Sequence, residues 1–202
     1  MDIAQKLIDA VVKADSPQKL IEAVKALANA QLETGISTLI TVLGYNNPGA
    51  ALLAAEGLIA MGDKVVTPLL TQIDGYNYGA RAYAIRTLAA IAHPSALEQL
   101  LKAAAFDFAP SVRRAAAKGL GNLRWQELPP EQISEAQAKA ITTLLQICQD
   151  DDWSIRYAAI VGLDLLTKKG EFPQIMSKFK DMVENETDVA VIARIKLAIS
   201  IS

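Results

Sequence analysis

The sequence contains few of the residues that carry metal, redox or nucleic-acid chemistry. Its 202 residues include one cysteine and one histidine, so an internal disulfide is excluded and paired histidine ligands cannot be assembled. No metal site is therefore expected. The formal net charge of −2 leaves no positive excess to neutralise a phosphate backbone, and nucleic acid is not expected as the main partner.

Long apolar runs are missing as well. No stretch reaches 18 uninterrupted apolar residues, so no helix that spans a membrane is expected. The first residues lack a basic region followed by an apolar run, which is the pattern of a secretion signal. These two absences predict a cytoplasmic protein.

Aromatic residues are scarce, at 5% of the chain, whereas 51% of the residues are hydrophobic. This balance favours helices that pack through alanine and leucine, and no alternation typical of strands competes with it. The most regular segment is Ser-Val-Arg-Arg-Ala-Ala-Ala-Lys-Gly-Leu at residues 111–120, and related segments occur at residues 50–58, 80–88 and 155–163. The chain therefore contains an internal repeat.

The repeat recurs at a regular spacing. The last position of the template falls at residues 27, 58, 88, 120, 163 and 199, which are 31, 30, 32, 43 and 36 residues apart. Such periods indicate an α-solenoid, in which each helix pair is too thin to bury a face alone and stacks on its neighbours. We expect an all-α fold of about five to six helix pairs that forms one domain over residues 1–202.

Helix starts are marked by a capping side chain followed by proline, as at Ser16 and Asn47. The long period of 43 residues indicates an insertion near residues 127–138, which contains two adjacent prolines. We expect this insertion to form a longer loop before a helix over residues 136–149.

Over about residues 47–200, a capping acid followed by Val/Ile-Arg-x-x-Ala-x-x-x-Leu resembles the HEAT-like repeat of the phycobilisome lyase family. Two segments are more specific: Asn-Tyr-Gly-Ala-Arg-Ala-Tyr-Ala at residues 77–84 and Ala-Ala-Phe-Asp-Phe-Ala-Pro-Ser-Val-Arg-Arg-Ala-Ala at residues 104–116. Together with the short overall length, they resemble the smaller, F-type subunit of the heterodimeric phycocyanobilin lyases of cyanobacteria and red algae.

That resemblance implies an enzyme that is active only as a heterodimer. F-type subunits work with a larger E-type solenoid partner and attach phycocyanobilin, an open-chain tetrapyrrole, through a thioether to a cysteine of the phycocyanin α subunit. The nucleophile belongs to the acceptor protein. The chain is therefore expected to bind the bilin as a substrate, with no permanently bound cofactor, and to orient it for attack near the phycobilisomes in the cytosol.

A bilin has two propionate carboxylates, a long conjugated face and pyrrole nitrogens that can carry positive charge. Its binding site should combine arginines, aromatic rings and an acid. The same template position holds an arginine in three of the repeats. Aromatic residues lie near the ends of the same helices, and in a solenoid these helices line the concave side. The candidate bilin-binding residues are Tyr78, Arg81, Tyr83, Arg113, Arg114, Trp153, Arg156 and Tyr157.

A structural interpretation stands beside each of these assignments. A repeated arginine is often a ladder residue that binds the capping carboxylate of its own or the next repeat, and a repeated aromatic ring can be simple packing. Arg113 occupies the shared template position and Arg114 does not, so Arg114 is freer to meet a propionate or a partner. The three acids at residues 150–152 form a solvated cap in one interpretation and face a bilin nitrogen in the other.

Cys148 lies on a helical stripe with Ile141 and Leu144, which predicts a buried structural thiol. His93 precedes a proline at a helix junction and is expected to be a cap or a turn residue. A similar, isomerising lyase of phycoerythrocyanin is associated with a His-Cys pair. Because the two residues are far apart in this sequence, isomerase activity is not expected.

Two other functions fit the repeat. A non-catalytic interaction or scaffold protein of phycobilisome assembly or turnover would share every repeat and need no bilin, and a bilin-transfer assay separates it from a lyase subunit. A DNA-alkylation glycosylase built on similar repeats would need a basic concave face, which the acidic balance of the chain disfavours.

Overall fold

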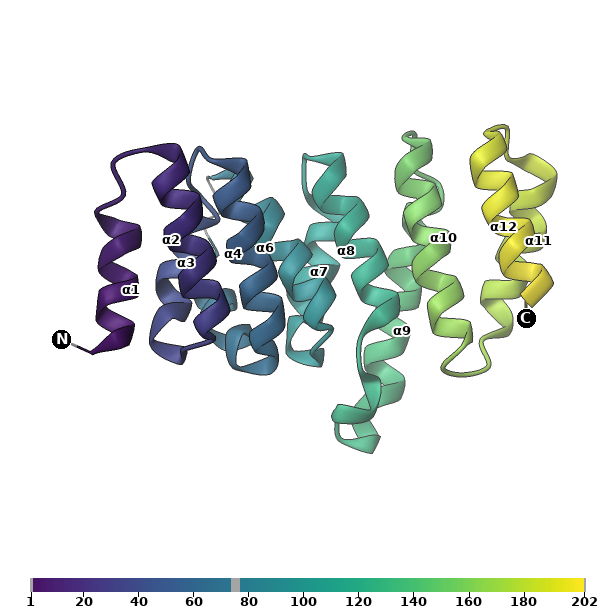
Figure 1. The fold of residues 1–202 in the computed structure, drawn as a ribbon. Coiled ribbons are helices and arrows are strands. Elements are labelled where there is room, and N and C mark those ends of the chain that lie inside the picture. Colours follow the sequence, from purple (N-terminus) through teal and green to yellow (C-terminus); the bar gives the residue numbers. More distant parts are fainter. Residues whose placement is uncertain (1, 74–76, 202) are drawn as a thin grey trace. The chain divides into compact units, whose positions relative to one another are not determined.

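The structure is a computed structural model that describes residues 2–73 and 77–201 (Figure 1). Within these ranges every regular element is a helix. The α-helices are α1 (Ile3–Val12), α2 (Pro17–Ala30), α3 (Ile36–Val42), α4 (Pro48–Met61), α5 (Val66–Gln72), α6 (Tyr78–Ile91), α7 (Leu97–Phe106), α8 (Pro110–Asn122), α9 (Pro130–Ile147), α10 (Trp153–Thr167), α11 (Pro173–Asn185) and α12 (Val189–Ile201). Short 3-10 helices are η1 (Glu33–Gly35), η2 (Gly62–Val65), η3 (Pro94–Ala96) and η4 (Trp125–Glu127).

The chain divides into two compact units, residues 1–91 and 92–202, each with its own stack of helices. In the first unit, α4 packs against α2, α3 and α6. In the second unit, α8 packs against α7 and α10, and α10 packs against α9 and α12. Even-numbered helices therefore contact one another in succession within each unit, and the predicted all-α solenoid of helix pairs is confirmed. A single domain over residues 1–202 stays a prediction.

The helix starts follow from capping chemistry. The Ser16 hydroxyl accepts a hydrogen bond from the Lys19 N–H (3.3 Å), and the Asn47 side chain accepts one from the Ala50 N–H (3.1 Å). Proline occupies the first position of both helices, where a missing N–H costs nothing. The predicted starts of α2 and α4 are confirmed.

The template leucines form the core of the repeat. Five of these side chains are at most 1% exposed: Leu27, Leu58, Leu88, Leu120 and Leu163. The last copy differs, because Ile199 is half-buried while Ala198 is fully buried. Val191 is fully buried eight residues before Ile199, like Val112 and Ile155 at the same template position, so the register of the template in α12 is the one predicted.

Two glycines bring α8 and α10 unusually close together. A Cβ atom added to Gly121 would overlap the backbone carbonyl of Gly162, and one added to Gly162 would overlap the carbonyl oxygen of Ala117. Lack of space, rather than backbone conformation, therefore requires glycine at this crossing. The contact fixes the spacing of the two helices that carry most of the candidate residues.

The insertion is helical, and its prediction as a long loop is wrong. The short helix η4 covers Trp125–Glu127, and α9 begins at Pro130 rather than near residue 136. The adjacent prolines do not prevent a helix because Pro130 stands at its first position, and good helix formers follow. Trp125 is only 3% exposed and packs in the interior.

A buried ion pair joins α10 to α12. Arg194 Nη2 lies 2.5 Å from Asp164 Oδ2, and the two side chains are only 11% and 5% exposed. Lys168 Nζ approaches the same carboxylate oxygen at 3.3 Å. Because an unpaired charge at this depth is costly, the pair holds α12 in place against α10.

Candidate functional site

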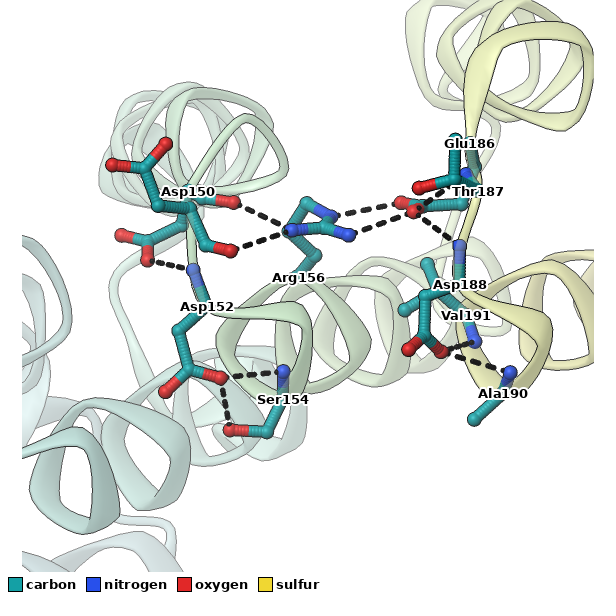
Figure 2. Close-up of polar contacts among 10 residues, drawn as sticks. Asp150, Asp152, Ser154, Arg156, Glu186, Thr187, Asp188, Ala190 and Val191 are labelled. Atoms are coloured by element: carbon teal, nitrogen blue, oxygen red, sulfur yellow. Dashed lines mark hydrogen bonds and ion pairs between the residues drawn. The ribbon is translucent and has the colours of Figure 1, made fainter.

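A ladder of ion pairs connects the last repeats. Arg113 on α8 places Nη2 at 2.6 Å from Asp150 Oδ2, and its Nε donates to the Ala104 carbonyl at 3.0 Å. Arg156 on α10 donates to both carboxylate oxygens of Glu186, at 2.8 and 2.7 Å (Figure 2). Both arginines thus bind an acid that precedes the next even-numbered helix, and the ladder interpretation is confirmed for them.

Further hydrogen bonds from Arg156 to backbone carbonyl groups hold it in place beside Glu186. Arg156 Nη1 also donates to the carbonyl groups of Asp150 (2.8 Å) and Asp151 (3.1 Å). Hydrogen bonds from Arg156 lower the pKa of Glu186 from its ordinary value of 4.5 to about 2, and the same contacts raise the pKa of Arg156. The arginine is fully engaged in holding α10 to the segment before α12.

The acids before α12 act as helix caps as well. Glu186 accepts hydrogen bonds from the Thr187 N–H (3.0 Å) and the Asp188 N–H (2.9 Å). The Asp188 carboxylate accepts from the Ala190 N–H (2.9 Å) and the Val191 N–H (3.1 Å) (Figure 2). One short segment therefore caps α12 and receives the arginine of the preceding repeat.

A groove of about 670 Å³ opens on α8, α10 and the start of α12. It is lined by Arg114, Lys118, Asp152, Trp153, Ser154, Tyr157 and Ala190. Three of the candidate bilin-binding residues, one from α8 and two from α10, line this groove together. Arg113 and Arg156 instead line two smaller cavities next to Asp150 and Asp151.

Arg114 belongs to a hydrogen-bonded chain that crosses the groove. Its Nη1 donates to Ser154 Oγ (2.8 Å), and the serine hydroxyl in turn donates to Asp152 Oδ1 (2.6 Å). The Ser154 N–H donates to the same carboxylate oxygen at 2.8 Å (Figure 2). These bonds from Ser154, together with the charge of Arg114, lower the pKa of Asp152. Asp152 is therefore an ionised cap of α10, which agrees with the cap interpretation.

Arg114 is less committed than Arg113, as predicted. In the described part of the chain, its one hydrogen bond goes to a neutral hydroxyl, whereas Arg113 binds a carboxylate and a carbonyl group. Arg114 also lines the groove, together with its other lining residues. Arg114 can therefore bind a carboxylate without giving up an ion pair.

Two aromatic side chains form one wall of the groove. Trp153 and Tyr157 are four residues apart on α10, so they lie on the same face of the helix. Trp153 is 49% exposed and Tyr157 is half-buried. Among the described residues, neither the Tyr157 hydroxyl nor the Lys118 ammonium group has a hydrogen-bond or ion-pair partner. Both remain available to a ligand.

The other three candidates lie on α6 in the first unit. Tyr78 is 46% exposed, whereas Arg81 is only 8% exposed. The Tyr83 hydroxyl donates to the Pro48 carbonyl (3.4 Å), and the Arg86 guanidinium carbon lies 6.0 Å from the centre of the Tyr83 ring. Tyr83 is thus held against α4, and a role for Tyr78, Arg81 and Tyr83 in bilin binding stays a prediction.

The single cysteine and the single histidine have structural positions. Cys148 is 3% exposed, and burial raises the pKa of its thiol to about 12, so it is not a nucleophile at neutral pH. His93 caps η3 by accepting a hydrogen bond from the Ser95 N–H at its Nδ1 (3.1 Å). Both predictions are confirmed.

Comparison with known proteins identifies the family. A model of HEAT repeats matches residues 72–164. The chain is 55% identical over 197 residues to the phycocyanobilin lyase subunit beta of Nostoc sp., covering 97% of this chain and 98% of the relative. It is 51% identical to the protein of the same name from Thermosynechococcus vestitus, covering 95% of this chain and 92% of that relative. The chain belongs to the phycocyanobilin lyase subunit beta family.

Other comparisons agree with this membership. The phycocyanin alpha phycocyanobilin lyase CpcF of Synechocystis sp. is 50% identical, with 95% of this chain and 90% of the relative covered. A chain in the complex of CpcE and CpcF of phycocyanin lyase from Nostoc sp. is 58% identical, with a TM-score of 0.79 over 81% of this chain and 97% of that chain. The predicted resemblance to F-type lyase subunits is confirmed. Within the described ranges, no helix combines the length and apolar character that crossing a membrane requires.

Neither Lys118 nor Ser154 was a candidate from the sequence, although both are polar residues that line the groove. Lys118 follows Arg114 by four residues and shares its helix face, a signal that the sequence does contain. Ser154 bridges Arg114 and Asp152, and this role becomes visible only once α8 is packed against α10.

Proposed function

We propose that this chain is the smaller subunit of a bilin lyase, which joins phycocyanobilin through a thioether to a cysteine of the phycocyanin α subunit. It acts with an E-type partner subunit, in the cytoplasm of a cyanobacterial cell. The observation that carries the proposal is the high identity to phycocyanobilin lyase subunits beta over nearly the full length of both chains.

The groove on α8 and α10 supports the proposal because its residues suit a binding site for the bilin. Arg114 binds a propionate with the donors that Ser154 leaves unused. Trp153 and Tyr157 contact the conjugated face of the tetrapyrrole. Asp152 is ionised and lies where it can pair with a protonated pyrrole nitrogen.

The chain contributes binding and orientation rather than a nucleophile. The attacking thiol belongs to the acceptor protein, and the only cysteine of this chain is buried with its pKa raised to about 12. Holding the bilin in one conformation while the acceptor cysteine approaches replaces an encounter of freely tumbling reactants with an oriented one. The bilin is thus a substrate that leaves with the product.

The need for a partner is supported by the surface of the second unit. Phe106 at the end of α7 and Phe108 on the turn before α8 are 80% and 77% exposed. Asp107 holds this turn by accepting a hydrogen bond from the Ala109 N–H at 2.9 Å. Exposed aromatic pairs on rigid turns are typical of protein interfaces, and the structural relative was solved in a complex of CpcE and CpcF.

Co-expression tests the proposal. The chain is produced with an E-type subunit, the phycocyanin α subunit and a bilin source, and covalent colour on the acceptor is measured after denaturing electrophoresis. The expected result is a coloured acceptor only when both lyase subunits are present. An acceptor that stays uncoloured in the complete mixture contradicts the proposal, and efficient colouring by this chain alone contradicts the need for the partner.

A further inference from the structure

We propose that Lys118 is a second carboxylate-binding residue of the groove, and that Lys118 and Arg114 together make α8 the wall that receives both propionates of the bilin. This inference rests on the proposed function and adds the direction in which the bilin lies. Its carboxylate edge faces α8, and its conjugated face lies on the aromatic wall of α10.

The charges of the groove support this arrangement. Arg114 is linked to Asp152 through Ser154, so one positive and one negative charge offset each other. Lys118 is exposed and, among the residues that the structure describes, has no ion-pair partner. The groove therefore has one unbalanced positive charge, although the chain as a whole has a net charge of −2.

The spacing of the two cations fits two carboxylates on one molecule. Arg114 and Lys118 are four residues apart on α8, which places the bases of their side chains about 5–6 Å apart on the same face. Both line the same groove, so both can reach one ligand. A single propionate would need only one of them, whereas a dicarboxylate engages both.

The residues that line the groove from α10 differ in chemistry from those on α8, and this favours one orientation of the bilin. Trp153 and Tyr157 contribute aromatic rings from α10, and Asp152 contributes a carboxylate that stays ionised because Ser154 donates two hydrogen bonds to it. That carboxylate repels a propionate and attracts a protonated nitrogen. The two edges of a bilin therefore prefer different walls of the groove.

The test compares phycocyanobilin with its dimethyl ester, in which both propionates are neutral. Binding of each to the complex of this chain with the E-type subunit is measured by absorbance titration. Lys118→Gln is expected to weaken binding of the free acid about tenfold, because a charge-assisted hydrogen bond is lost, and to leave binding of the ester unchanged. Lys180→Gln, at an exposed position of α11 outside the groove, is the matched control and should bind both forms like the parent.

The outcomes separate this inference from the proposed function. Equal affinity of the parent and Lys118→Gln for the free acid overturns the role of Lys118, and so does an equal loss for acid and ester. If one of these two results is found and the parental pair still colours the acceptor, the proposed lyase function holds and only the role of Lys118 is wrong. A parental complex that binds the bilin but never transfers it contradicts the function, while the acid-to-ester comparison still decides the role of Lys118. A complex that binds neither form overturns the inference.

Discussion

Replacing Arg156 by alanine should destabilise the fold strongly, because it breaks the best-connected pair of the ladder. Arg156 and Glu186 are only 16% and 5% exposed, and the guanidinium makes two hydrogen bonds to the carboxylate and two to backbone carbonyl groups. Removing one partner of a buried pair costs about 3–5 kcal/mol, and the partial exposure of Arg156 favours the lower end, about 3 kcal/mol. For a chain of this size, that corresponds to a melting temperature lower by about 6–12 °C.

Thermal melts followed by circular dichroism measure this change. Arg114→Ala is the matched control, because Arg114 bonds only a neutral hydroxyl among the described residues and should shift the melt far less. The double variant of Arg156→Ala with Glu186→Gln should recover part of the loss, since no unpaired carboxylate is then left behind. A melt of Arg156→Ala within about 1 °C of the parent would refute the claim that this pair holds the repeats together.

The same pair predicts a pH dependence. The pKa of Glu186 is lowered to about 2 in the folded chain from an ordinary value of 4.5, so the unfolded chain binds the proton more readily. Its stabilisation is therefore fully present above about pH 4.5 and is lost as the pH falls toward 2. Melts of the parent between pH 5 and 3 should show this loss, and Arg156→Ala should show a flatter profile in that window. Parallel profiles of the two proteins would contradict the assignment.

Three further changes test other parts of the structure. Gly121→Ala should lower the free energy of unfolding by about 1–3 kcal/mol or more, because the added Cβ overlaps the Gly162 carbonyl. The control Gly79→Ala should be neutral or stabilising. Equal urea midpoints of the two variants would contradict the close crossing of α8 and α10. Leu163→Ala should cost about 2–5 kcal/mol in the same urea titration, and an unchanged midpoint would mean that the template is misplaced. Cys148→Ser should leave bilin transfer by the pair intact, and loss of transfer without loss of folding would restore the thiol as a carrier.

Much of the fold is predictable from the sequence because its determinants are local. The caps at Ser16 and Asn47 and the buried template leucines follow from one or two residues each, and they recur at the repeat spacing. The insertion near residues 127–138 is different. Its adjacent prolines fit either a loop or a helix start, and the choice depends on packing of α9 against the repeats beside it.

The candidate site is predictable only in part. Template position explains why Arg113 and Arg156 both pair with an acid of the next repeat, since these two copies place the arginine alike. The grouping of Arg114 with Trp153 and Tyr157 depends instead on the distance between α8 and α10, which the contact of two glycines sets. Ser154 could not be selected in advance, because its bridge joins residues 40 positions apart.

Whether the groove on α8 and α10 holds the bilin is tested most directly by two adjacent arginines. Initial rates of bilin transfer and thermal melts are measured for Arg114→Ala and Arg113→Ala in the pair reconstituted with the E-type subunit. Arg114→Ala should transfer bilin several-fold more slowly with a nearly parental melt, whereas Arg113→Ala should melt at a lower temperature because Asp150 loses its partner. Transfer at the parental rate by Arg114→Ala would contradict the assignment of the bilin to this groove.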